Sequence, residues 1–286
     1  MAGFSFPRSQ KRDTRPTNSP DIQRAPADDR PLSWLGISPR SLLILIVDLA
    51  LLLVVWHLAA VQIDANFLPT PGAAFQAFAE RINQGEMVDH ALISTRRVVV
   101  SIAIGAGLAL PLAVLTAQLR TLDQLLTPLL YFIYPAPKIV FLPLILFAFG
   151  LYGDTSRVFL ISLVIFFQVF VIVRDAAVQV RPETLESLNS LGAGWWQRMR
   201  YVYIPVTVPA VITALKISTG TAIAVLYISE GIAGRTGLGY FIQDSFSNVR
   251  YPDIYAGIIA ISALGLALFT VFWVAERYLT RWQRSG

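Results

Sequence analysis

The side chains best able to do chemistry are polar or charged residues inside long apolar stretches. A charge or an amide is costly in such surroundings, and it commonly marks a path for ions or solutes. The candidates for lining such a path are Tyr131, Tyr134, Lys138, Gln168, Ser218, Thr221 and Glu230. Lys138 is a cation, so it could attract an anion, or it could pair with Asp154 or Glu230. The chemistry indicated is the binding of a small solute.

Each candidate also has a structural interpretation, which the sequence leaves open. Ser218 and Thr221 flank Gly220, and their hydroxyls could simply bond helix backbone in a closely packed interface. Near Lys138 the chain has three prolines, which remove backbone donors and predict a bend: Pro135, Pro137 and Pro143. Such a bend is tolerated in a membrane where it packs in protein or lines a water-filled cavity.

The sequence lacks the residue sets that catalysis or metal binding would need. It has no cysteine and two histidines, His57 and His90, which are too far apart for a zinc site on one helix. It has no H-E-x-x-H motif, no paired intramembrane aspartates and no convincing Ser–Lys or Ser–His spacing. The phosphate-loop pattern G-x-x-x-x-G-K-[ST] is also missing, so no ATP site of that kind is expected. An intramembrane enzyme is therefore disfavoured.

The elements that must position these residues are membrane-spanning helices. Of the 286 residues 55% are hydrophobic and 14% are charged, and the charges cluster between long apolar runs. A soluble domain usually carries about a quarter charged residues, whereas a helical span needs about 20 mostly apolar ones. The sequence predicts an all-α polytopic protein with six spans, over 41–63, 92–119, 122–149, 158–178, 204–229 and 254–279.

The placement of charge predicts the orientation of these spans. Residues 1–40 have the composition of a disordered tail, and the apolar run after them is longer than the core of a cleaved signal peptide. Ala59-Ala60 could mimic a cleavage site, but we favour a retained first span. Arg and Lys are more frequent in the tail and in the loops on its side, so both termini are expected in the cytoplasm. This placement accounts for the net charge of +5 without nucleic acid.

Two connections have patterns of their own. The outer segment 64–90 begins with prolines and continues with apolar residues at helical spacing, which predicts a short interfacial helix before a five-helix core over 91–282. In the inner loop, 179–203, Pro182 suits the start of a helix and Gly192 suits the turn that ends it. Three leucines between them predict one apolar stripe: Leu185, Leu188 and Leu191. This loop fits a docking element for a cytoplasmic partner, or an amphipathic helix on lipid headgroups.

The inner loop also resembles a known motif. Glu186, Gly192 and Pro205 have the spacing of the "EAA" signature of ABC importer permeases, although Ser187-Leu188 stand where Ala-Ala is usual. Three further segments are similar to elements of the nitrate/taurine/sulfonate-type permeases: Phe67-Leu68-Pro69-Thr70-Pro71, Tyr134-Pro135-Ala136-Pro137-Lys138 and Gly237-Leu238-Gly239-Tyr240. The resemblance covers roughly residues 64–282.

This resemblance implies a type I ABC importer permease core, MetI-like, with a cytoplasmic coupling helix, in a bacterial inner membrane. Each copy would pair with a second copy and dock on a separate ATPase that binds ATP and Mg²⁺. A periplasmic or lipid-anchored binding protein would deliver a small anionic solute, such as nitrate, a sulfonate or taurine, or a vitamin precursor. The residues expected to couple the permease to the ATPase are Glu183, Glu186, Leu188, Leu191, Gly192, Ala193, Trp196, Arg198 and Pro205. The alternative is a secondary transporter or channel that works without ATP.

Overall fold

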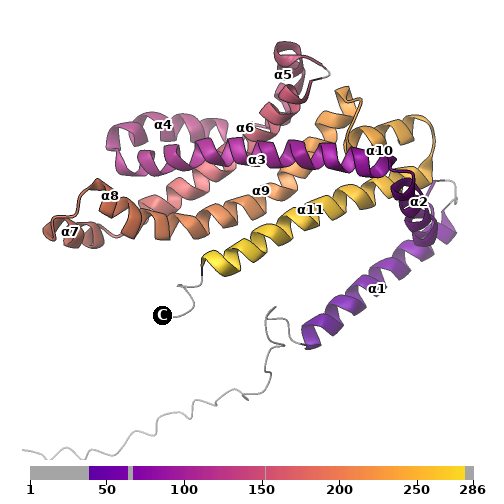
Figure 1. The fold of residues 1–286 in the computed structure, drawn as a ribbon, viewed down its shortest axis with the longest axis horizontal. Helices are drawn as coiled ribbons and strands as arrows, with labels where there is room; N and C mark the ends of the chain where they lie inside the picture. The colour runs from indigo at the N-terminus through magenta and orange to yellow at the C-terminus, as the bar shows by residue number, and fades with distance from the viewer. Residues whose placement is uncertain (1–38, 64–66, 152, 281–286) are drawn as a thin grey trace, which may run out of the picture. The chain divides into compact units, whose positions relative to one another are not determined.

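The structure is a computed structural model, and it describes residues 39–63, 67–151 and 153–280. Every regular element in these ranges is a helix, which confirms the all-α prediction (Figure 1). The predicted tail, residues 1–40, lies outside the described residues except for Pro39 and Arg40, with which the first helix begins.

Within the described ranges, five helices are long and apolar enough to cross a membrane. They are α1 (Pro39–Gln62), α3 (Glu86–Gln118), α6 (Asp154–Val178), α9 (Ile204–Ala233) and α11 (Tyr251–Leu279). A sixth span is possible if the sharply bent pair between α3 and α6 crosses the membrane as one unit. The number and order of the predicted spans agree with this arrangement.

The chain divides into two compact units between Val54 and Val55. This boundary lies within helix α1, so each unit contains part of that helix. In the first unit the described residues of α1 are almost all exposed, and most of them are leucine, isoleucine or valine. In the second unit the end of α1 is attached by Trp56, whose indole Nε1 donates to the carbonyl oxygen of Pro69 at 3.1 Å. The Trp56 ring centroid also lies 5.8 Å from that of Tyr255.

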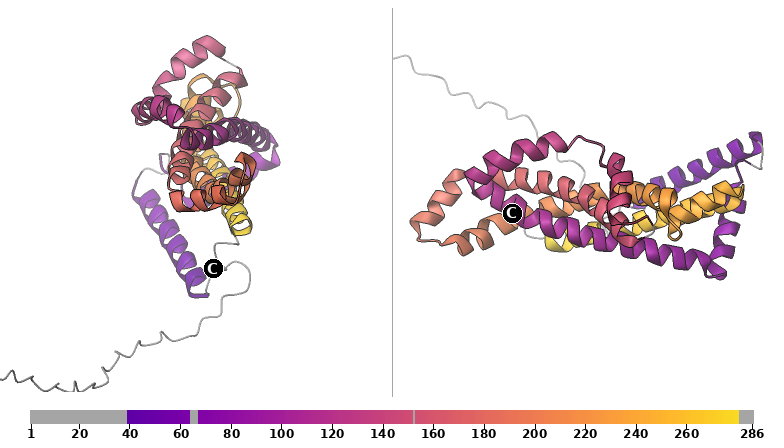
Figure 2. Two further views of the ribbon diagram at one scale, coloured as in Figure 1. Left: turned by 90° about the vertical axis from the view of Figure 1, so that its left-hand side faces the viewer. Right: turned by 90° about the horizontal axis from the view of Figure 1, so that it is seen from above.

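The core of the second unit is built where α3, α6 and α9 run side by side, as the views of Figures 1 and 2 show. Gly105 permits the close approach of α3 and α6, because a Cβ there would lie 2.6 Å from the Ser162 carbonyl oxygen. Small residues at such crossings are typical of membrane helices, which gain most of their association from close packing. Ile165 and Phe170 of α6 are completely buried in this core.

The third predicted span is broken rather than merely bent. Helix α4 (Arg120–Ile133) is followed by a 3₁₀ turn, η1 (Lys138–Phe141), and by α5 (Leu142–Phe149), with an angle of 85° between the two halves. Pro135 and Pro137 lie at the break, where they provide no backbone donors to continue the helix. Both halves expose large apolar side chains, and Phe132 of α4 and Phe147 of α5 are 83% and 91% exposed.

Two short helices lie at the end of the bundle where α3 begins. Helix α2 (Pro71–Asn83) starts at Thr70, whose hydroxyl accepts from the backbone N–H of Ala73. Its Arg81 forms ion pairs with Glu86 of α3 and Asp253 of α11, at 2.8 and 2.6 Å, and so joins three helices. The hydrogen bond to Asp253 raises the pKa of the Arg81 guanidinium above its ordinary value. The second short helix, α10 (Leu238–Ser247), packs on α9 and α11.

Candidate functional site

The inner loop folds as helix, turn, helix. Helix α7 (Pro182–Ser190) begins at Pro182, as predicted, and α8 (Trp195–Arg198) follows the turn. Gly192 ends α7 with φ +74°, a left-handed conformation that glycine adopts without a Cβ clash. The N–H of Gly192 donates to Asn189 O at 2.9 Å and that of Ala193 to Leu188 O at 3.0 Å, which is the Schellman arrangement for a helix end.

The side of this loop away from the helix bundle is exposed and has no partner among the described residues. Helices α7 and α8 contain no buried residue, and Leu191 and Trp196 are 83% and 66% exposed. The predicted leucine stripe is divided, because Leu185 packs against the core whereas Leu191 follows the last turn of α7 and faces away. Exposed large apolar side chains grouped in this way are typical of a contact surface.

A side-chain hydrogen bond ties the loop to the helix bundle: the indole Nε1 of Trp195 donates to Gln118 Oε1 at the end of α3, at 3.0 Å. Within the loop, Arg198 Nη1 donates to Asn189 Oδ1 at 3.4 Å and so joins α8 to α7. A π-helical turn, η2 (Met199–Tyr203), then joins α8 to α9, and Pro205 lies in the first turn of α9. A force on the loop would therefore reach α3 and α9 as well as α6.

Four of the seven predicted path residues meet at one pocket of about 320 Å³: Tyr134, Lys138, Gln168 and Thr221. They come from the broken span, from α6 and from α9. The Gln168 side chain donates from Nε2 to Thr221 Oγ1 at 3.1 Å, whereas its Oε1 is buried without a partner among the described residues. A buried amide oxygen in that state would gain from a hydrogen-bond donor on a solute or a water.

Lys138 forms no ion pair with Asp154 or Glu230, so the second of the two alternatives given for it does not hold in this structure. Its ammonium group lies 5.1 Å from the ring centroid of Tyr134 and 5.0 Å from that of Phe167, and it donates to the Tyr134 carbonyl oxygen. These are cation–π distances. Among the described residues that line the pocket there is no carboxylate, and the two carboxylates considered as partners pair with arginine instead.

Two other predicted path residues lie elsewhere. The Tyr131 hydroxyl donates to Asp175 in a polar cluster that joins α4 to α6. In the same cluster Arg174 pairs with Asp123 at 2.5 Å and with Asp175 at 3.1 Å. Ser218 is buried in α9, and its hydroxyl oxygen has no partner among the described residues.

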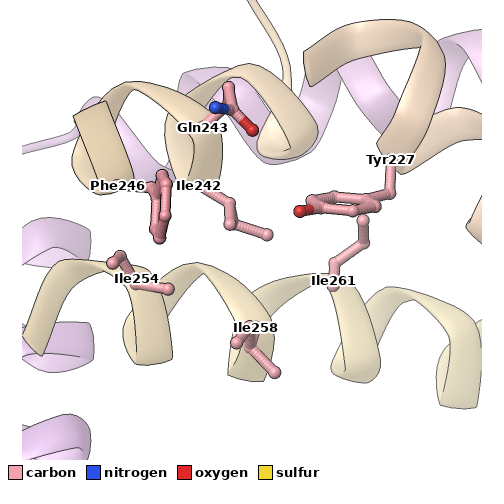
Figure 3. A pocket seen from close by; sticks show the side chains of 7 residues that line it. All are labelled: Tyr227, Ile242, Gln243, Phe246, Ile254, Ile258 and Ile261. Atoms are coloured by element: carbon pink, nitrogen blue, oxygen red, sulfur yellow. The ribbon is translucent and has the colours of Figure 1, made fainter. Parts of the chain in front are cut away.

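A separate hollow of about 500 Å³ lies between α9, α10 and α11 (Figure 3). Isoleucines from α10 and α11 make up most of its wall, and the polar side chains at its edge are those of Tyr227 and Gln243. The wall contains no charged side chain and none of the predicted site residues. The chemistry of this hollow suits apolar contact rather than a charged solute.

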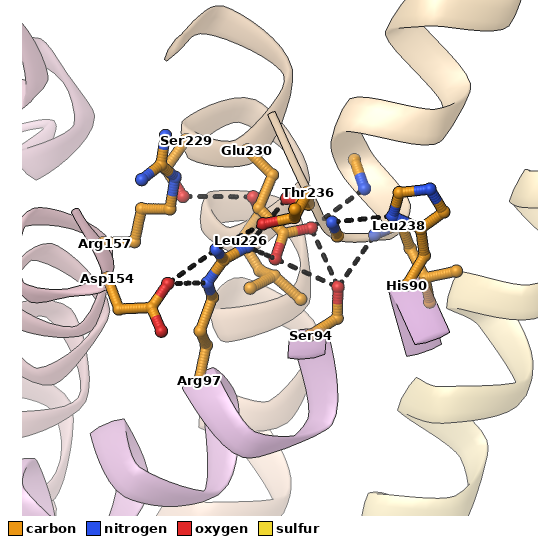
Figure 4. Close-up of polar contacts among 12 residues, drawn as sticks. His90, Ser94, Arg97, Asp154, Arg157, Leu226, Ser229, Glu230, Thr236 and Leu238 are labelled. Atoms are coloured by element: carbon orange, nitrogen blue, oxygen red, sulfur yellow. Dashed lines mark hydrogen bonds and ion pairs between the residues drawn. The ribbon is translucent and has the colours of Figure 1, made fainter. Parts of the chain in front are cut away.

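Glu230, the last predicted path residue, is enclosed in a buried ion cluster (Figure 4). Its carboxylate accepts from Arg97 Nη1 at 2.7 Å, from the Ser94 hydroxyl at 2.9 Å and from the backbone N–H of Gly239 at 2.9 Å. Arg97 and Glu230 are 3% and 0% exposed. Glu230 is thus enclosed by the side chains and backbone of this chain.

All five N–H donors of Arg97 are used in this cluster. Besides Glu230, they bind Asp154 Oδ1 from Nε and Nη2 at 2.9 and 2.6 Å, and the carbonyl and hydroxyl oxygens of Thr236 at 2.8 and 3.0 Å. Arg97 lies within α3, in the segment predicted as the second span, and it was not among the predicted site residues. His90, Ser94 and Arg97 recur at helical spacing, so they lie on one face of a helix. This spacing was the signal from which the sequence could have indicated the cluster.

That face of α3 holds the loop before α10. The backbone N–H groups of Gly237 and Leu238 donate to His90 Nδ1 at 3.0 Å and to Ser94 Oγ at 2.8 Å. A Cβ at Gly237 would overlap the Glu230 carboxylate, and one at Gly239 would lie 2.5 Å from Tyr227 O. The two glycines of the Gly-Leu-Gly-Tyr segment are therefore required because the loop closes directly over Glu230.

Comparisons with known proteins agree with this architecture. Residues 109–285 match the family model described as "Binding-protein-dependent transport system inner membrane component". The chain is 28% identical over 269 residues to the putative aliphatic sulfonates transport permease protein SsuC of Bacillus subtilis, covering 94% of this chain and 95% of that one. It is 27% identical over 260 residues to the taurine transport system permease protein TauC of Escherichia coli, covering 88% and 94%.

Among solved structures, an inward-facing form of the MetNI methionine ABC transporter is similar, with a TM-score of 0.58. The match covers 69% of this chain and 98% of that chain at 17% identity. At this identity the likeness shows the fold alone, and it confirms the predicted type I importer permease architecture.

Proposed function

The chain belongs to the family of binding-protein-dependent transport system inner membrane components, the permeases of ABC importers, and we propose that its inner loop couples transport to a separate ATPase. The observation that carries this proposal is the exposed outer face of α7 and α8, which is attached to the bundle at both ends. A partner that moved this loop would move the inner ends of α6 and α9 with it.

The residues proposed to contact the ATPase lie on and just after α7. Glu183 and Glu186 supply charge, Leu188 and Leu191 supply apolar contact, and the Gly192-Ala193 turn supplies the shape. Arg198 holds α8 against α7 through Asn189, and Pro205 marks the start of α9. Trp196 differs from these residues in its surroundings, because it also lines an apolar groove of the helix bundle.

In this proposal ATP and Mg²⁺ bind to the partner, since this sequence lacks the phosphate-loop pattern. Closure of two ATPase subunits would move two such loops and rock the paired spans between inward and outward openings, a rigid-body change. A second copy of this chain would complete the path. Exposed Phe132 and Phe147 on the broken span provide apolar surface for that contact. The loop and both termini would lie in the cytoplasm.

The proposed solute is a small anion, delivered by a binding protein on the outer side. Support comes from the pocket at Lys138, where a cation lies beside the amide of Gln168 and the hydroxyl of Thr221 without a carboxylate to neutralise it. A sulfonate carries one negative charge and three hydrogen-bond acceptors, which suit the ammonium group of Lys138 and the hydroxyl of Thr221, whereas the free oxygen of Gln168 needs a donor such as a water. The named substrates of SsuC and TauC are of this chemical class.

Cross-linking from single cysteines tests the docking proposal, because the natural chain has none. Leu191→Cys should form a cross-link to the ATPase in an importer reconstituted with its ATPase and binding protein. Phe246→Cys, at a 60% exposed position on α10, is the matched control and should give no such cross-link. Labelling of Leu191→Cys by an impermeant maleimide from the outer face of intact cells would contradict the proposal.

A further inference from the structure

An apolar groove of about 670 Å³ opens beside α8, on the end of the bundle that carries the inner loop. Helices α3, α9 and α11 form its walls, with Val114, Val211 and Ala275 as representative residues. Thr207 contributes a hydroxyl, but that group already donates to Tyr203 O at 2.8 Å. The walls therefore suit a hydrocarbon chain and offer no site for a polar solute.

The mouth of the groove has the residue types that occur where a membrane meets water. Trp195 and Trp196 of α8 line it, and indole rings favour the headgroup level of a bilayer. Arg198 lines a neighbouring pocket that shares Leu115 and Trp195 with the groove, and Arg200 is exposed directly after Met199 of the groove wall, so positive charge lies close to the apolar entrance. Basic side chains at this level attract anionic lipid headgroups.

We propose that an anionic phospholipid of the leaflet next to α8 binds here, with one acyl chain in the groove and its headgroup beside Arg198 and Arg200. Apolar walls account for the chain, and the arginines account for a preference for negative charge. A neutral lipid would use only the first of these features. A neighbouring protein segment would leave the arginines without a role.

This lipid would bear directly on the inner loop. Trp195, Trp196 and Met199 form one wall of the groove, and they belong to α8 and to the π-helical turn that joins α8 to α9. An acyl chain in the groove would support the loop from behind, whereas the exposed end of α7 remains available on the other side. The lipid site and the ATPase contact would therefore share Trp196 and Arg198 of α8, whereas the residues of α7 proposed for the contact lie outside the groove.

Native mass spectrometry of the full chain, purified in mild detergent after exposure to equal amounts of phosphatidylglycerol and phosphatidylcholine, tests the proposal. Val211→Phe fills the groove from α9 and should lower retention of phosphatidylglycerol about tenfold, because a displaced pair of methylene groups has an effect of that size. Val206→Phe, on the same helix but outside the groove wall, is the matched control and should retain the lipid. Arg198→Gln combined with Arg200→Gln should remove the preference for phosphatidylglycerol.

The remaining outcomes would each overturn the proposal. Equal retention of phosphatidylglycerol by Val211→Phe and Val206→Phe would show that the groove does not hold the chain. Equal retention of the two lipids by the natural sequence would show that the arginines select nothing. A loss of dimer rather than of lipid in Val211→Phe would assign the groove to protein–protein contact.

Discussion

Sequence motifs occur at both ends of the helix bundle, but their side chains are buried at one end and exposed at the other. At the outer cluster, defined by His90, Ser94, Arg97 and Glu230, the side chains are buried, except that of His90, which is partly buried, and their hydrogen bonds are made within the chain. At the inner loop, residues 179–203, the motif residues are exposed and large apolar groups lack partners in the described chain. A motif residue can therefore serve the fold or a partner, and burial separates the two roles.

The difference has an energetic basis. A buried ion pair offsets the cost of desolvation only when its remaining hydrogen bonds are also made. Arg97 satisfies that condition, since each of its five donors has an acceptor. An exposed side chain such as Leu191 adds almost nothing to stability, so its type is free to be set by a partner. Substitutions at the two ends should consequently affect different measured quantities.

The largest effect on stability is expected at the outer cluster. Arg97→Met should lower the free energy of unfolding by ~3–5 kcal/mol, because the buried carboxylate of Glu230 would lose its ion pair with Arg97, whereas Asp154 keeps Arg96. The measurement is thermal unfolding of the purified chain in detergent. Arg97→Met combined with Glu230→Gln is the control and should recover part of the loss. A single variant as stable as the natural sequence would show that the cluster is not structural.

A smaller loss is expected from the loop that covers Glu230. Gly239→Ala introduces a methyl group 2.5 Å from Tyr227 O and 2.8 Å from Glu230 Cβ. Overpacking of this kind usually costs about 1–3 kcal/mol of stability. Gly107→Ala is the matched control, because a Cβ there meets no atom within 4 Å. If both variants melted at the same temperature, the close approach of this loop would be refuted.

At the inner loop the expected effect is on transport rather than on stability. Glu186→Lys reverses a charge on the exposed face of α7 and should lower ATP-driven uptake about tenfold, or ~1.4 kcal/mol of coupling. Its melting temperature and its amount in the membrane should be unchanged, since surface substitutions rarely alter stability by more than ~0.5 kcal/mol. Uptake at the natural rate would count against the docking role of α7.

The smallest effect is expected at the pocket between the two ends. Lys138→Met removes the cation beside Tyr134 and Phe167 and should slow uptake of a sulfonate about fivefold, the size of a cation–π and charge contribution of ~1 kcal/mol. Lys138→Arg keeps the charge and is the control. Uptake by both variants at one rate, in the same vesicles, would remove the argument for an anionic solute.

The sequence predicted those parts of the molecule that depend on local pattern. Apolar runs located the spans, and Pro182 and Gly192 located the start and end of α7, because these residues act on their own backbone. The sequence did not reveal the pairing of Arg97 with Glu230, which are 133 residues apart. For the same reason the sequence could not decide whether Lys138 pairs with a carboxylate, since contacts between helices depend on packing that a single sequence does not encode locally.

The extent of the break in the third span was also beyond local pattern. Three prolines predicted a bend, but the angle of 85° depends on how η1 and α5 pack against α6. The grouping of Tyr134, Lys138, Gln168 and Thr221 follows from that packing, and so does the removal of Tyr131 to another cluster. Residue type indicated the candidates for a path, but only the fold shows which of these candidates lie together at one pocket.

The most direct test of the account is the amount of ATP hydrolysed per solute imported. It is measured in one preparation of vesicles that contain the permease, its ATPase and its binding protein. Gly192→Pro cannot adopt the φ of +74° at the end of α7, so it should change the shape of the loop without reaching the buried outer cluster. The account predicts that hydrolysis continues while uptake falls, so that the ratio rises about tenfold relative to Gly107→Ala. An unchanged ratio, with both variants folded in the membrane, would contradict the claim that the inner loop transmits the action of ATP.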